Sequence, residues 1–101
     1  MISLLINSWK RQDNIRRIID AQKGFDLIDE ILIFNNNPDI QISYNHYKVK
    51  VINSSIDFGL RTRWVNGVLA KNDCLVFQDD DLVAKEEAFE KIWHHFNDDP
   101  E

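Results

Sequence analysis

The chain is most tightly constrained by residues 74–81, which have the sequence CLVFQDDD. Four apolar residues in a row are typical of a strand buried on both faces, so the three aspartates stand at the carboxyl end of that strand. At about 4 Å and an effective dielectric constant near 20, each pair of these carboxylates would repel by roughly 4 kcal/mol. The cluster must therefore be spread into water, partly protonated, or neutralised by a metal ion or a basic partner.

Two interpretations of the aspartates fit the sequence. Side chains alternate along an extended chain, so Asp79 and Asp81 can lean to one side while Asp80 faces away. Two carboxylates with a third acceptor nearby suit Mg²⁺ or Mn²⁺ shared with a phosphorylated substrate. In the plainer interpretation, Asp81 caps the next helix and the other two aspartates are solvated in a loop.

Composition limits the class of protein. A chain of 101 residues with 44% hydrophobic residues suits one globular domain, residues 1–101. Its net charge of -5 argues against a general nucleic-acid or anionic-membrane binder. Cys74 is the single cysteine, so no intramolecular disulfide forms, and its apolar surroundings suggest a packed thiol. The first residues resemble neither a signal peptide nor a membrane span, so we expect a reducing, cytoplasmic location.

Apolar segments alternate with amphipathic ones along the chain. Strands are predicted over 2–6, 31–34, 47–52 and the apolar run from Cys74, and helices over 14–23, 58–71 and a last segment after the aspartates. Asp13 is the expected cap of the first helix, whose inner face carries Ile15, Ile18, Ile19 and Gln22; the last helix should bury Ala88, Phe89, Ile92, Trp93 and Phe96. The alternation predicts an α/β fold: a mostly parallel, Rossmann-like sheet of about four strands with helices on both faces.

Polar residues follow every predicted strand. In parallel sheets, ligands bind at the carboxyl ends of the strands, so these residues are the candidates for chemistry. An aromatic residue with two cations suits a base and a diphosphate, amides suit a base or ribose, and aspartates suit a metal that bridges phosphates. In chain order the segments are 7–11 (NSWKR), 35–37 (NNN), 53–55 (NSS) and 79–81 (DDD).

The order of these motifs resembles the nucleotide-binding half of a GT-A glycosyltransferase. The resemblance rests on LLINSWKR at 4–11, ILIFNNN at 31–37, RTR at 61–63 and AKNDCLVFQDDD at 70–81. The last segment is similar to the signature of family 2 transferases, in which an apolar strand leads to an Asp-x-Asp motif. The paired asparagines and the Phe-x-x-x-Trp helix are closer to the exostosin C-terminal domain.

The resemblance implies roles for the candidate residues. Asp81 would coordinate Mn²⁺ or Mg²⁺, and Asp79 or Asp80 would contact ribose or reach the metal, directly or through water. The nucleotide would be contacted by Arg11 after the first strand, by Asn35 and Asn36 at the nucleoside, and by Arg61 or Arg63 at the base or diphosphate. The spacing to the aspartates fits either of the last two arginines.

The resemblance also implies the reaction, which is transfer of a sugar from a nucleotide diphosphate sugar to an acceptor hydroxyl. A UDP-sugar is favoured because the resembled families often use one. The acceptor-binding half of the family, with its catalytic base, has no match in residues 1–101, so no catalytic residue is assigned. The alternative is a non-catalytic, metal-dependent nucleotide-binding module or a subunit of an assembly. In either case we expect self-association or a partner chain to cover the open sheet edge.

Overall fold

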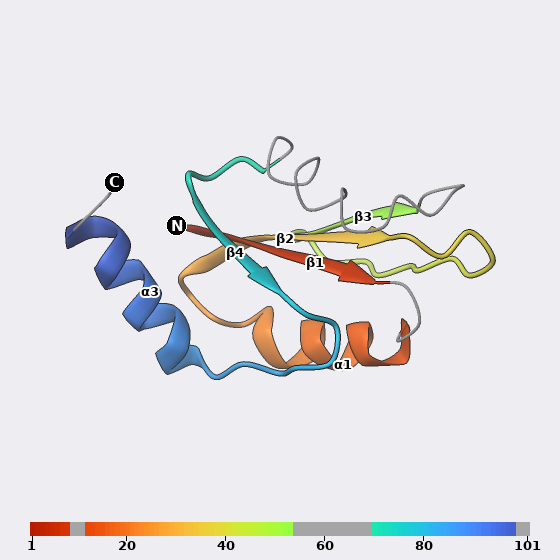
Figure 1. Ribbon diagram of the computed structural model, residues 1–101, viewed down its shortest axis with the longest axis horizontal. Coiled ribbons are helices and arrows are strands. Elements are labelled where there is room, and N and C mark those ends of the chain that lie inside the picture. The colour runs from red at the N-terminus through yellow and green to blue at the C-terminus, as the bar shows by residue number, and fades with distance from the viewer. Residues whose placement is uncertain (9–11, 54–69, 99–101) are drawn as a thin grey trace.

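The protein is described by a computed structural model for residues 1–8, 12–53 and 70–98 (Figure 1). Within these residues, no helix is long and apolar enough to cross a membrane. The elements in chain order are β1 (Ile2–Ser8), α1 (Gln12–Gln22), β2 (Ile28–Asn35), β3 (Val49–Asn53), β4 (Cys74–Gln78) and α3 (Glu86–Asp98).

The four strands form one sheet in the order β3-β2-β1-β4, and every neighbouring pair is parallel. Ile2 of β1 pairs with Ile28 of β2 and with Cys74 of β4, so both neighbours start level with the start of β1. The parallel α/β fold expected from the alternating apolar segments is confirmed. All four carboxyl ends consequently point to the same edge of the sheet.

The central and edge strands differ in burial, and β4 is less buried than its four consecutive apolar residues predict. β1 and β2 are buried along almost their whole length, which fits their continuous apolar runs. The edge strands β3 and β4 are shorter and expose part of their side chains, including Phe77. A strand with one neighbour has less of its surface covered, so these two strands are less protected than the centre of the sheet.

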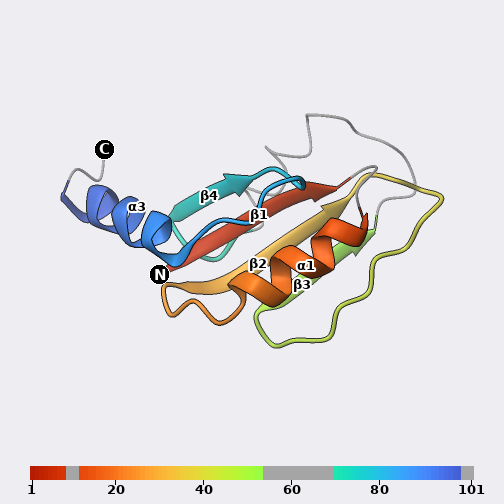
Figure 2. The same ribbon diagram turned by 90° about the horizontal axis from the view of Figure 1, so that it is seen from below.

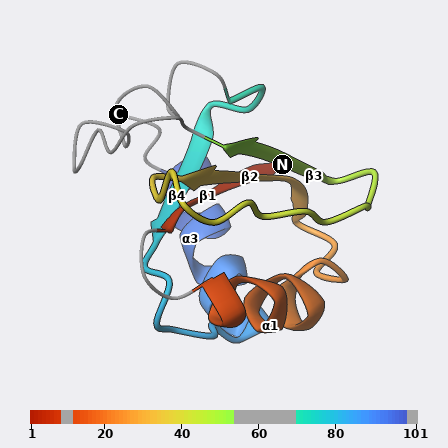
Figure 3. The same cartoon turned by 90° about the vertical axis from the view of Figure 1, so that its right-hand side faces the viewer.

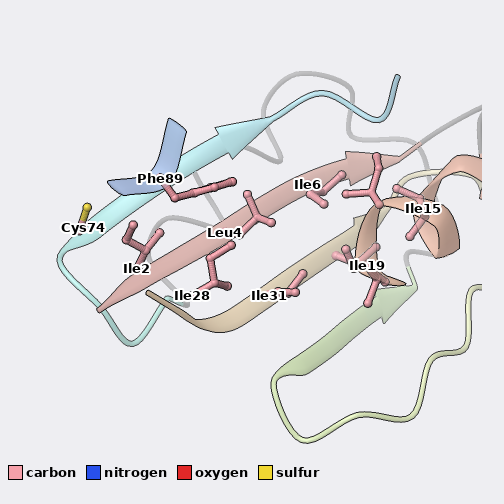
Figure 4. Close-up of a cluster of buried hydrophobic side chains, with 11 residues drawn as sticks. Ile2, Leu4, Ile6, Ile15, Ile19, Ile28, Ile31, Cys74 and Phe89 are labelled. Carbon is pink, nitrogen blue, oxygen red and sulfur yellow. The ribbon is translucent and has the colours of Figure 1, made fainter. Parts of the chain in front are cut away.

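The core lies between one face of the sheet and α1, with α3 closing its end (Figure 4). Ile15, Ile18 and Ile19 recur at helical spacing and are each no more than 1% exposed, which confirms the predicted inner face of α1. Phe89 of α3 packs into the same cluster, and the centre of its ring lies 5.8 Å from the centre of the Phe25 ring.

Both described helices lie on the same face of the sheet (Figure 3). The helix expected over 58–71 lies almost entirely outside the described residues, and residues 70 and 71, which are described, are not helical. On the other face, Leu5 and Leu32 are nevertheless buried.

Two details of the helices differ from the sequence prediction. α1 begins at Gln12, so Asp13 lies in its first turn instead of capping it; a carboxylate there is still favoured by the helix dipole. In α3, Phe89 is buried and Trp93 and Phe96 are partly buried, but Ala88 and Ile92 are exposed. The prediction that Ala88 and Ile92 are buried is therefore wrong. Each lies one residue, about 100° of helix rotation, away from the side of α3 that packs against the core.

Candidate functional site at the carboxyl edge of the sheet

Three strands end in line at the candidate site. Ser8 of β1 pairs with Asn35 of β2, which pairs with Asn53 of β3. β4 ends slightly earlier, because its last residue, Gln78, lies opposite Ile6. The β1–β2 ladder runs one step beyond the strand ends, since the Asn36 backbone N–H donates to the Ser8 carbonyl oxygen at 2.7 Å.

Asn35 holds the segment that follows β2. Its side chain is 0% exposed, and its amide nitrogen donates to the Ile40 carbonyl oxygen and to Asn53 Oδ1, the latter at 3.0 Å. Its Oδ1 accepts a hydrogen bond from the Asn37 backbone N–H at 3.0 Å. The sequence suggested a nucleoside contact for Asn35 and for the buried Asn36, and that role stays a prediction. The hydrogen bonds of Asn35 hold the loop that follows β2 in place.

Asn53 completes this arrangement from β3. Its side-chain amide accepts from the Ile42 backbone N–H at 2.9 Å and donates to the Ile42 carbonyl oxygen at 3.0 Å. The amide thus pairs with residue 42 as a neighbouring peptide group in a sheet would. Together, Asn35 and Asn53 fix the segment 36–42 across the ends of β2 and β3.

A cleft of about 270 Å³ lies between α1 and the segment 40–44. Its wall includes Asp13, Arg16 and Tyr44. The Arg16 guanidinium donates to the Ser43 carbonyl oxygen at 3.3 Å and lies 5.5 Å from the centre of the Tyr44 ring. This arginine therefore fastens the segment to α1. The arginines predicted to contact the nucleotide, Arg11, Arg61 and Arg63, lie outside the described residues.

The three aspartates form the turn directly after β4. Asp79 and Asp81 are exposed and Asp80 is partly buried, so water reaches their carboxylates. α3 begins only at Glu86, five residues after Asp81, and the prediction that Asp81 caps the next helix is therefore wrong. The solvated positions of the other two aspartates agree with both interpretations of the sequence.

The described residues contain no group of three or more histidine, cysteine, aspartate or glutamate side chains close enough to hold a metal ion. Adjacent aspartates along one turn therefore do not converge into a cage made by protein alone. The donor set is carboxylate oxygen, which is the chemistry that Mg²⁺ and Mn²⁺ prefer. Such residues fit a metal that takes its remaining ligands from water and substrate.

One feature of the site was missed from the sequence. Gln22, the last residue of α1, and Gln78, the last residue of β4, form a reciprocal pair in which each amide nitrogen donates to the other amide oxygen, at 2.9 and 2.8 Å. Gln22 is 0% and Gln78 is 8% exposed. The available signal was a glutamine on the apolar face of a helix and another ending an apolar strand, but nothing in the sequence pairs them.

A second polar cluster lies toward the amino ends of the strands. The buried Glu30 carboxylate accepts from Ser3 Oγ at 2.7 Å and from the Lys71 backbone N–H at 2.9 Å, and lies 3.3 Å from Lys50 Nζ. Burial by itself raises the pKa of Glu30, but these three donors together lower that pKa below its ordinary value. The cluster ties the segment entering β4 to β2.

Comparison with known proteins agrees with the order of motifs. No curated protein sequence matches the chain. The sequence profile described as glycosyl transferase family 2 matches residues 3–101, which is nearly the entire sequence and includes every candidate site residue. The parallel sheet, the polar carboxyl edge and this match lead to one conclusion: the chain belongs to glycosyl transferase family 2.

Proposed function

We propose that this glycosyl transferase domain binds a nucleotide diphosphate sugar at the carboxyl edge of its sheet, with Mn²⁺ or Mg²⁺ between the aspartate turn and the diphosphate. The observation that carries the proposal is the turn at Asp79–Asp81, where three adjacent carboxylates follow a strand of the sheet and two of them are exposed. Mg²⁺ commonly binds one or two carboxylates and completes its shell with water and substrate phosphates. A site of that kind needs no cage of protein ligands.

Each candidate residue has its own role in the proposed donor site. Asp79 and Asp81 would hold the metal, and Asp80 would contact ribose or reach the metal through water. The loop fixed by Asn35 and Asn53 borders the site from β2 and β3 and supports a nucleoside position near Asn36. The bound metal would supply Lewis-acid stabilisation of the charge that develops on the leaving diphosphate.

Exposed apolar side chains lie on and around the edge strand β4. Phe77 is 44%, Leu82 55% and Val83 44% exposed. Their exposure supports the expectation that self-association or a partner chain covers this edge. Light scattering tests it: a monodisperse monomer that binds no hydrophobic dye would contradict the expectation.

Titration calorimetry tests the donor site. Uridine and guanosine diphosphates would be titrated into the protein with and without Mn²⁺, and into the double variant Asp79→Asn/Asp81→Asn. We expect metal-dependent binding of the uridine compound by the unaltered protein and its loss in the double variant. The matched control is Asp26→Asn/Asp73→Asn, which removes two exposed carboxylates away from the carboxyl edge and should bind normally.

The outcomes separate the candidate functions. If neither diphosphate binds in the presence of Mn²⁺, the proposal of a donor site in this chain is wrong. Metal-dependent binding without transfer to any acceptor and without donor hydrolysis would favour a non-catalytic nucleotide-binding module. Equal loss of binding in both double variants would show that net charge, and not the aspartate turn, is responsible.

A further inference from the structure

The turn that carries the three aspartates is tied to the core at both of its ends. On entering the turn, Gln78 exchanges two hydrogen bonds with Gln22, at 2.9 and 2.8 Å. On leaving it, the chain returns to the same pair: Gln78 Nε2 donates to the Leu82 carbonyl oxygen at 2.6 Å, and Gln22 Oε1 accepts from the Ala84 backbone N–H at 2.9 Å. Two side chains thus close the loop 79–83.

The geometry of this closure is restrictive. A reciprocal amide pair makes two roughly parallel hydrogen bonds, so it fixes the orientation of both side chains as well as their separation. Both glutamines are at least nine-tenths buried, where an amide that lost its partner could not turn to water. Figure 2 shows that the chain after β4 turns back toward α3. The hydrogen bonds of the pair to Leu82 and Ala84 hold the start of this returning segment.

Neither glutamine is placed to touch a ligand. Both are covered by protein, while the aspartates next to Gln78 are exposed or partly buried. The contacts link the end of α1 to two parts of the chain that are distant from it in sequence: the end of β4 and the segment before α3. The three aspartates follow Gln78 directly in the chain. A displacement of Gln78 would therefore move all three carboxylates.

We propose that Gln22 and Gln78 are positioning residues for the donor site. They hold the turn in the conformation that presents Asp79 and Asp81 to a metal-bound diphosphate. The inference rests on the proposed donor site but assigns a role to residues that bind neither metal nor nucleotide. Groups that orient metal ligands in this way typically change metal affinity by about 10- to 100-fold when removed.

Three variants test the role: Gln22→Met, Gln78→Met and the double variant. Methionine keeps the length and nearly the volume of glutamine but offers no amide. The single variants leave one buried amide without its partner. The double variant removes both amides and leaves only the Leu82 carbonyl oxygen and the Ala84 N–H without these partners, so it should retain the fold even if a single variant does not. The matched control is Ile19→Val, which perturbs the same core and removes no group of the amide pair.

The measurement is the Kd of uridine diphosphate in the presence of Mn²⁺, by calorimetry well below the melting temperature of each variant. We expect the double variant to bind about 10-fold more weakly or worse, and Ile19→Val to bind like the unaltered protein. Hydrogen exchange at the backbone amides of 79–84 should accelerate in the double variant and not in Ile19→Val.

Each other result has a definite meaning. A folded double variant with unchanged Kd would overturn the positioning role and leave the donor site standing. Equal weakening in Ile19→Val would assign the effect to general loss of stability and would also overturn it. If the unaltered protein binds no diphosphate with Mn²⁺, the donor site fails, and the positioning role fails with it.

Discussion

Two groups of carboxylates in this protein have opposite surroundings. Glu30 is 1% exposed and is stabilised inside the fold by hydrogen bonds from a hydroxyl and a backbone N–H and by an ion pair with a lysine. The aspartates at 79–81 occupy a turn in which two of the three are exposed. One carboxylate is thus built into the sheet, and the others are presented at its edge.

The difference distinguishes a charge held inside the fold from charges presented at the edge of the sheet. The Glu30 carboxylate joins β2, β1 and the segment that enters β4 through these hydrogen bonds. The aspartates need no such burial, and three like charges in one turn repel each other. A bound cation at this turn would reduce that repulsion. Four measurements test this difference.

The largest effect is expected from Glu30→Ala. The change leaves Ser3 Oγ and the Lys71 backbone N–H without their acceptor, and we expect the free energy of unfolding to fall by about 3 kcal/mol. Urea denaturation measures it, with Asp26→Ala as the exposed control. A loss no greater than that of the control would show that the buried carboxylate is dispensable.

The second effect is on pH dependence. The pKa of Glu30 is lower in the folded protein than in the unfolded chain, so its contribution is complete above the unfolded value of about 4.3 and is lost as pH falls through the folded value. We expect the urea midpoint of the unaltered protein to decline in acid more steeply than that of Glu30→Gln. Parallel curves for the two proteins would contradict the cluster as described.

The third and smaller effect is expected from Lys50→Met. The Lys50 side chain is 64% exposed, so its ion pair with Glu30 is screened by water. Its removal should cost about 1 kcal/mol or less, with the same urea assay as the measurement. A cost as large as that of Glu30→Ala would mean that the lysine, and not the neutral donors, compensates the buried charge.

The smallest effect on stability is expected from Asp79→Asn/Asp81→Asn. Asp79 and Asp81 are exposed, and substitutions of exposed side chains usually change stability little, so the free energy of unfolding should change by less than about 0.5 kcal/mol. Thermal and urea denaturation in buffer without metal provide the measurement. Marked destabilisation would place these aspartates in the same structural class as Glu30.

Much of the fold followed from local patterns. The apolar runs predicted the four strands, and Ile15, Ile18 and Ile19 predicted the buried face of α1. The position of the aspartates at a strand end was also visible, because it depends only on residues adjacent in sequence.

The remaining features depend on pairing between distant segments. Gln22 with Gln78, and Glu30 with the backbone of residue 71, come together only when the strands are in register. Asn35 lies at the carboxyl end of a strand, where a ligand contact is expected. The sequence does not show that its side-chain amide instead forms hydrogen bonds with the backbone of the following loop. Charged and amide side chains are ambiguous in this way because the same groups serve ligands and the backbone equally well.

The pairing of β4 with β1 has a consequence for how the protein folds. Cys74 meets Ile2 only after most of the chain has been placed, and closing so long a loop is entropically unfavourable and slow. β1 and β2, which are close in sequence, should form first, and β4 should dock late and open early. Native-state hydrogen exchange would then show that the backbone amides of β4 are weakly protected from exchange. A bound ligand would increase this protection, because it binds only the folded state.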